Sequence, residues 1–209
     1  MILDPAQVLV FMAAGIALNL TPGADMMFCL GQGLKSGART GFAASLGIAT
    51  GGAIHTLAAA LGLAALLTAH PVAFEALKWA GVAYLVWLAV QAFRKPLELD
   101  LPDGVKRAGP LKAWRDGTLV NLLNPKVIVF ILAFLPQFVD PSRGSSLAQF
   151  LLLGLIFNIT GTIVNGAVGI GAGSVREVLK ANARLARWLG YLSGTVFLML
   201  ALRLAFDRR

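Results

Sequence analysis

The sequence has little charge, one cysteine and two histidines. Asp, Glu, Lys and Arg make up only 13% of its 209 residues, which is far less than the surface of a soluble domain requires. The single cysteine, Cys29, excludes an internal disulfide and a cysteine-rich metal site. A Walker A loop, an HExxH motif and a Ser-His-Asp grouping are also missing, so the sequence has no known loop for ATP hydrolysis and no recognisable hydrolytic site.

Apolar residues dominate instead, at 57% of the chain with a mean hydropathy of +0.76. These apolar residues form six long blocks. A block must reach about 20 residues to cross roughly 30 Å of hydrocarbon as a helix, and each of the six does so. A backbone in lipid must satisfy its own hydrogen bonds, which runs of this length do as helices. The sequence therefore predicts an all-α membrane protein with six transmembrane helices. The blocks are residues 5–34, 40–68, 71–93, 113–139, 146–173 and 185–206.

The N-terminus reads MILDP and has no basic segment before its apolar run. A secretory signal peptide requires such a segment and a shorter apolar core. We therefore expect the first block to remain in the mature protein.

The net charge of +8 comes mainly from alternate connections between the blocks. By the positive-inside rule these connections face the cytoplasm of a bacterial inner membrane, and both termini face outward. The charge is better explained by topology and contact with anionic lipid than by nucleic-acid binding. Twelve of the eighteen basic residues belong to this set: Lys35, Arg39, Arg94, Lys95, Lys106, Arg107, Lys112, Arg115, Arg176, Lys180, Arg184 and Arg187.

The chain divides into two halves, residues 1–94 and 113–209, joined by a polar cytoplasmic linker at 95–112. Each half has three blocks, and an odd number of crossings makes the second half enter the membrane upside down. This is the arithmetic of an inverted repeat, which is common in secondary transporters. A short internal match supports it, because Leu20-Thr21-Pro22 and Leu123-Asn124-Pro125 share one pattern near the middle of blocks one and four.

The two prolines are expected to break their blocks into half-helices. Proline disrupts a helix interior but suits the first position of a new helix, and Pro22 is followed by Gly23. Thr21 and Asn124 each precede a proline and are good N-cap residues. The sequence thus predicts two helix N-termini that meet at mid-membrane and form an electropositive site for a carboxylate.

A charged residue stands beside each break, Asp25 after Pro22 and Lys126 after Pro125. An ion at the centre of a membrane helix costs about 2.5 to 3.5 kcal/mol, so it is a functional candidate by default. We expect Asp25 to bind the α-ammonium group of a zwitterion and Lys126 to bind its α-carboxylate. The alternative is a permanent salt bridge between the two that only holds the halves together.

Weaker candidates are the other polar residues of the blocks. His55 could relay protons, because histidine has the only side chain that normally changes charge near neutral pH, although a hydrogen-bonded helix contact is the favoured interpretation. Asn19, Asn121, Asn158 and Asn165 could line a polar path or join helices. The glycines, including Gly47 and Gly51 and the series Gly166, Gly169, Gly171 and Gly173, are interpreted as close-packing surfaces.

These residues resemble the LysE/RhtB family, whose members export amino acids and their derivatives from bacteria. The matching stretches are NLTPGADMMFCLGQGLKSGARTGFAASLGIATG at 19–51 and NLLNPKVIVFILAFLPQFVDP at 121–141. The resemblance covers essentially the whole chain and marks Pro22, Gly23, Asp25, Asn124, Pro125 and Lys126. Ala24 departs from it, because a second proline is frequent there. The resemblance also implies exchange of solute for protons.

The sequence therefore suggests an exporter of a small, neutral amino acid or derivative, such as homoserine, threonine or a branched-chain amino acid. Neutral solutes are favoured because no second acid accompanies Asp25. The expected partners are the solute, protons and lipid, without cofactor, metal or nucleic acid, and a homodimer is left open. One rival is a membrane enzyme that uses Asp25 and His55 as acid and base, but it lacks a nucleophile or metal cluster. The other is a structural or assembly subunit without transport.

Overall fold

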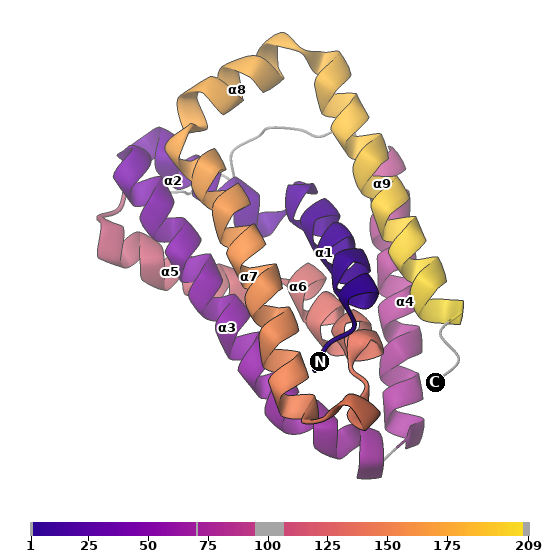
Figure 1. Ribbon diagram of the computed structural model, residues 1–209. Helices are drawn as coiled ribbons and strands as arrows, with labels where there is room; N and C mark the ends of the chain where they lie inside the picture. The colour runs from indigo at the N-terminus through magenta and orange to yellow at the C-terminus, as the bar shows by residue number, and fades with distance from the viewer. Residues whose placement is uncertain (1, 70, 95–106, 207–209) are drawn as a thin grey trace.

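The computed structural model describes residues 2–69, 71–94 and 107–206, and the regular structure of these residues is helical (Figure 1). Apolar blocks of the predicted lengths became helices with nearly the predicted bounds. The first half contains α1 (Pro5–Leu20), α2 (Ala24–Ser36), α3 (Ala38–Ala69) and α4 (Pro71–Arg94). The second half contains α5 (Pro110–Leu122), α6 (Pro125–Val129), α7 (Ser146–Ile170), α8 (Ala172–Ala181) and α9 (Ala183–Phe206).

Two of the six predicted spans are bent, as the prolines predicted. By length and hydropathy alone, α3, α4, α7 and α9 can each cross a membrane. The pair α1 and α2 is bent by 50°, and α5 and the segment 125–138 are bent by 53°. Counting each bent pair as one span gives six in the described part of the chain. The prediction of an all-α membrane protein with broken first and fourth spans is confirmed.

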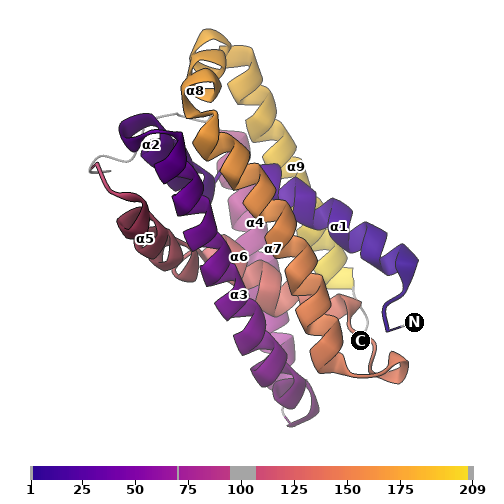
Figure 2. The same ribbon diagram turned by 60° about the vertical axis from the view of Figure 1, so that its left-hand side comes forward.

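The chain ends and connections sort to two ends of the bundle. In Figures 1 and 2, α2 and α8 lie near one end, and the start of α1 and the finish of α9 lie toward the other. At the first end the start of the second half meets the end of α2, where the Ala108 N–H donates to Ser36 Oγ at 3.1 Å. At the opposite end, Arg143 Nη2 lies 2.9 Å from Asp4 Oδ2. An even number of spans lies between the two termini, so both termini lie toward the same end of the bundle.

The linker ends earlier than the sequence suggested. The predicted linker, 95–112, overlaps the start of α5, which begins at Pro110, because proline suits the first turn of a helix. Residues 95–106 lie outside the described part of the chain. The sequence also did not predict α8, which forms a separate short helix with exposed Arg176, Glu177 and Val178.

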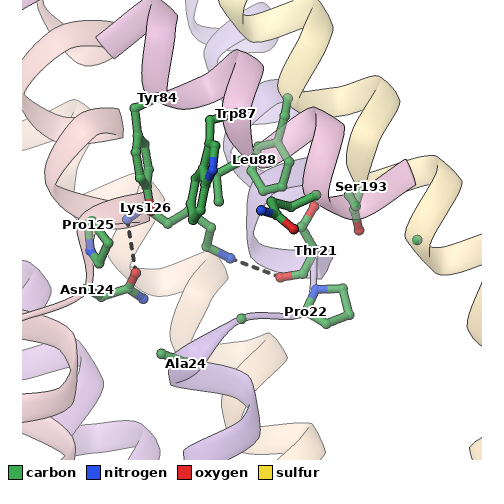
Figure 3. Close-up of a pocket in the computed structure, with 15 residues that line it drawn as sticks. Thr21, Pro22, Ala24, Tyr84, Trp87, Leu88, Asn124, Pro125, Lys126 and Ser193 are labelled. Atoms are coloured by element: carbon green, nitrogen blue, oxygen red, sulfur yellow. Dashed lines mark hydrogen bonds between the residues drawn. The ribbon is translucent and has the colours of Figure 1, made fainter. Parts of the chain in front are cut away.

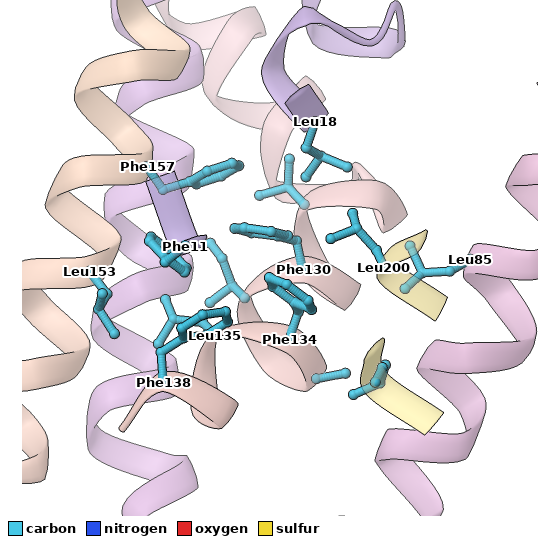
Figure 4. Close-up of a cluster of buried hydrophobic side chains, with 14 of the residues drawn as sticks. Phe11, Leu18, Leu85, Phe130, Phe134, Leu135, Phe138, Leu153, Phe157 and Leu200 are labelled. Atoms are coloured by element: carbon cyan, nitrogen blue, oxygen red, sulfur yellow. The ribbon is translucent and has the colours of Figure 1, made fainter. Parts of the chain in front are cut away.

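Aromatic packing fixes the second half-helix of the fourth span. After α6 the backbone widens into a π turn at Phe130–Phe134 (η1) and tightens into a 3-10 turn at Leu135–Phe138 (η2). Pro136 contributes to this change, because it has no N–H to donate. The ring of Phe130 lies 4.5 Å from that of Phe157 and 5.6 Å from that of Phe11, centroid to centroid. Figure 4 shows this buried cluster, which locks the segment against α1 and α7.

Glycine allows α3 to approach its neighbours closely. A β-carbon on Gly41 would collide with the main chain of Gly169 on α7, and one on Gly47 would collide with the main chain of Trp114 on α5. The interpretation of the predicted glycines as packing surfaces is confirmed for Gly47, Gly51 and Gly169, but not for Gly173, which has nothing within 4 Å. The contact brings α3, which belongs to the first half, against two helices of the second half.

Candidate functional site

The two breaks differ in how their second helices begin. Asn124 caps α6, because its Oδ1 accepts from the Lys126 N–H at 3.0 Å, and this prediction is confirmed. The prediction that Thr21 caps α2 is wrong. Thr21 instead ends α1, and its hydroxyl donates to the Ala17 carbonyl at 2.8 Å. The reason is that Pro22 and an extended Gly23 follow Thr21. The helix α2 therefore begins at Ala24 instead of at Pro22, and it has no side-chain cap.

Lys126 reaches from the second break to the first. Its ammonium donates to the Thr21 carbonyl at 2.9 Å (Figure 3) and to the Leu18 carbonyl at 3.2 Å. These carbonyls belong to the C-terminal end of α1, where the helix dipole is negative. The fit is tight, since a β-carbon on Gly23 would lie 3.2 Å from Lys126 Nζ. The main chain of one half therefore holds the cation of the other half.

Asp25 makes the reciprocal contact from the first half to the second. Its side chain is 7% exposed, and its Oδ2 accepts from Asn121 Nδ2 at 2.8 Å. Its Oδ1 has no hydrogen-bond partner among the described residues. No ion pair within 4.0 Å joins Asp25 to Lys126 in the described structure, so the direct salt bridge considered above is not formed in this conformation.

A cavity of about 410 Å3 opens where the two breaks face α4 and α9. Thr21, Pro22, Gly23, Asn124, Pro125 and Lys126 line it, as Figure 3 shows for most of them. We call it the break cavity. Its remaining wall is largely apolar and includes Tyr84, Trp87, Leu88 and Phe197, with Gln91 and Ser193 as polar members.

Sequence reasoning missed the wall residues of α4 and α9. Tyr84, Trp87 and Leu88 are unremarkable within an apolar block, because lipid-facing and cavity-facing side chains look alike in sequence. Gln91 and Ser193 were the available signals, as polar side chains inside predicted spans. The break cavity thus combines one ammonium group with an apolar wall, an arrangement that suits a small carboxylate with an apolar body.

Asp25 faces a second and much smaller space of about 20 Å3. We call it the amide pocket, because four asparagines line it. Its polar lining is Asn19, Asp25, Asn121, Asn158, Thr162 and Asn165. Asp25 and Lys126 therefore line different cavities, and the single shared cavity that we expected is not formed in this conformation.

His55 lines neither space. Its Nε2 lies 3.3 Å from the main-chain oxygen of Asn121, which fits the interpretation of a hydrogen-bonded contact between α3 and α5. The contact adjoins the residue that binds Asp25, so His55 stands one residue away from the carboxylate.

Comparison with known proteins agrees with this architecture. A family model described as LysE type translocator matches residues 16–208. The homoserine/homoserine lactone efflux protein of Salmonella typhi is 31% identical over 95% of both chains. The leucine efflux protein of Klebsiella pneumoniae is 28% identical over 94% of this chain and 93% of that protein. No solved structure shows significant similarity to the chain.

The match covers nearly the whole chain, including both breaks and both cavities. An uncharacterized membrane protein of Vibrio cholerae is also 31% identical over 94% of this chain and 95% of that protein. The resemblance noted in the sequence is thereby confirmed, and so is the expectation of a carrier rather than an enzyme. The chain belongs to the LysE type translocator family of multi-pass membrane proteins.

Proposed function

We propose that the protein exports a small, neutral amino acid or a close derivative from the cytoplasm. Homoserine, threonine and branched-chain amino acids are the candidate solutes. The observation that carries the proposal is the break cavity, which presents the Lys126 ammonium to an apolar space of about 410 Å3. The efflux of homoserine and leucine by two relatives, as their names state, supports the same class of solute.

The carboxylate of the solute would bind at the meeting point of the two breaks. The first N–H groups of α2 receive no side-chain cap, and Gly23 and Ala24 line the cavity beside Lys126. A free helix N-terminus carries about half a positive charge and binds anions. Together with the ammonium group it provides both charge and directional donors for a carboxylate, as in other transporters with discontinuous helices.

The rest of the cavity favours a solute without a second charge. No Asp or Glu is found among its described lining residues, so the side-chain cation of lysine or arginine would be buried without a partner. The α-ammonium group could donate to the Thr21 carbonyl, Gln91 Oε1 or Ser193 Oγ, all of which lie at this cavity. We assign the ammonium group to these acceptors in place of Asp25, which faces the amide pocket.

Asp25 is then available as the coupling residue for proton antiport. Protonation would remove the negative charge that strengthens its hydrogen bond from Asn121. That bond joins α2 to α5, so its weakening would let one half move against the other. His55 lies beside this link, with its Nε2 3.3 Å from the main-chain oxygen of Asn121, and is the candidate proton relay.

The location of the protein follows from the same reasoning. We propose a bacterial inner-membrane protein whose basic end, with Lys35 and Arg39, faces the cytoplasm and anionic lipid. Both termini would then face outward. Single cysteines at exposed positions of each end, labelled by a membrane-impermeant reagent in intact cells, would test this orientation after Cys29 is replaced by serine.

Reconstitution into liposomes tests the function directly. We expect a pH gradient to drive uptake of one or a few members of a panel of twenty amino acids and homoserine, with little uptake of lysine or arginine. Uptake that does not change with the pH gradient would refute proton antiport but not transport itself. No uptake of any solute by correctly inserted protein would refute the transport function and favour an assembly subunit.

A further inference from the structure

The amide pocket combines one carboxylate and several side-chain amides with an apolar wall that includes Ile48, Val127 and Phe157. The side-chain nitrogens of three of its asparagines each donate to a protein oxygen. Asn19 Nδ2 donates to Thr160 Oγ1 at 3.0 Å and to the Phe157 carbonyl at 3.3 Å, and Asn158 Nδ2 donates to the Ala49 carbonyl at 2.8 Å. Asn121 Nδ2 donates to Asp25 Oδ2. The partners of Asn158 and Asn121 are a carbonyl and a carboxylate oxygen, which cannot donate, so the orientation of these two amides is fixed by chemistry and their side-chain oxygens remain as acceptors.

Two of the oxygens have no partner. Asp25 Oδ1 and Asn121 Oδ1 are fully buried and accept no hydrogen bond within the described structure. Asn121 is 2% exposed and Asp25 is 7% exposed. A buried acceptor left without a donor costs about 1 to 3 kcal/mol, so a carboxylate oxygen and an amide oxygen that both lack a donor favour a ligand that offers positive charge.

The pocket also limits the size and charge of that ligand. Its volume of about 20 Å3 admits one small ion or one water molecule and excludes an amino acid. One carboxylate, Asp25, balances one positive charge. A divalent ion would leave a net charge in the low-dielectric interior, and no group of three or more His, Cys, Asp or Glu occurs among the described residues.

We propose that the amide pocket is a binding site for a monovalent metal cation, Na+, held by Asp25 Oδ1 and the side-chain oxygens of the surrounding asparagines. Hard cations take oxygen ligands of this kind, and broken membrane helices are a common place for coupling ions. Lys126 does not compete for the carboxylate, because its ammonium is held by the Leu18 and Thr21 carbonyls. This ion site is separate from the proposed solute site, and the binding of an ion to it can be measured without any transport.

The test uses the purified full-length protein in detergent. Its melting temperature is followed by tryptophan fluorescence while NaCl replaces choline chloride at constant ionic strength. A single site that binds only the folded state raises stability by RT ln(1 + [Na+]/Kd). We expect a saturable rise with Na+ and a smaller one with K+. A melting temperature that is the same in Na+ and choline would mean that the pocket holds water and would overturn the proposal.

Variants locate the site. Asp25→Asn keeps the shape of the side chain but removes its charge, and we expect the half-saturating Na+ concentration to rise at least tenfold. Asp116→Asn is the matched control, because Asp116 is a surface carboxylate paired with Lys112 on α5. A Na+ response that is unchanged in Asp25→Asn would overturn the assignment, as would its loss in Asp116→Asn.

A gain-of-function variant keeps the proposal testable if Asp25→Asn does not fold. The side chain of Asn165 lines the pocket and makes no hydrogen bond within the described structure, so Asn165→Asp adds a second carboxylate without removing a contact. We expect at least tenfold tighter Na+ binding and a new response to Ca2+. Binding of both ions that is no different from the parent protein would contradict the site.

Discussion

Replacing Lys126 with methionine separates its structural role from its proposed role in solute binding. The change keeps most of the side-chain volume and removes the ammonium group. The lost interactions are two hydrogen bonds to the Thr21 and Leu18 carbonyls. A hydrogen bond to a charged group contributes about 1.5 to 3 kcal/mol, which makes a gross loss of roughly 3 to 6 kcal/mol.

The variant also avoids the cost of burying a cation in the membrane, which is about 2.5 to 3.5 kcal/mol. The two quantities largely cancel, so the net destabilisation from Lys126→Met should be roughly 0 to 3 kcal/mol. We therefore expect inserted protein at near-parental levels. Removing one partner of a buried charge pair costs about 2 to 5 kcal/mol in binding, so the apparent affinity for an amino acid should fall at least about 30-fold.

The assay is liposome uptake of the best solute in the panel and of its carboxamide, which has no carboxylate. Lys126→Met should abolish the preference for the acid over the amide, while Lys126→Arg should retain part of it. Lys112→Met is the control, because Lys112 is an exposed lysine of α5. Parental uptake and parental preference in Lys126→Met would refute the assignment of the carboxylate to this residue.

Three further comparisons of variants test the fold and the break cavity. Asn124→Ala removes the α6 cap and should destabilise the protein by about 1 kcal/mol, whereas Thr21→Val should destabilise it less, because Thr21 does not cap α2. Melting temperatures measure both changes, and an equal fall in the two variants would contradict this assignment of the caps. Gly41→Ala should lower the melting temperature through its collision with Gly169, and the control Gly173→Ala, which meets nothing within 4 Å, should not. Trp87→Ala should weaken uptake of a branched-chain amino acid more than uptake of threonine, because it removes part of the apolar wall of the break cavity. An equal reduction in the uptake of both amino acids would place Trp87 outside the solute site.

The breaks could be predicted from sequence because they depend on local chemistry. Proline disrupts the middle of a helix wherever it falls, and an asparagine before proline caps the next helix, as Asn124 does. The failure at Thr21 has a local cause as well. Gly23 separates Pro22 from α2 and moves the cap position, and nothing in the residue types alone decides between Pro22 and Ala24 as the first helical residue.

The placement of Asp25 could not be predicted, because it depends on how the half-helices pack. A carboxylate in the first turn of α2 can point to either side of the break. The oxygen-rich amide pocket is built from residues of α1, α3, α5 and α7 that are distant in sequence. The same limitation applies to the aromatic wall contributed by α4, since burial in a cavity and exposure to lipid select the same apolar residues.

The two charged residues form reciprocal links between the halves. Lys126 belongs to the second half and binds the end of α1, and Asp25 belongs to the first half and binds Asn121 of α5. Any motion of one half against the other must therefore stretch or break both links. A solute carboxylate can take over the donors of Lys126, and a cation or proton can take over the acceptors of Asp25. Each ligand alone would free one link and leave the other intact. We infer that release of the two links at separate cavities is what couples the solute to the cation or proton, which is the requirement for transport driven by an ion gradient without ATP.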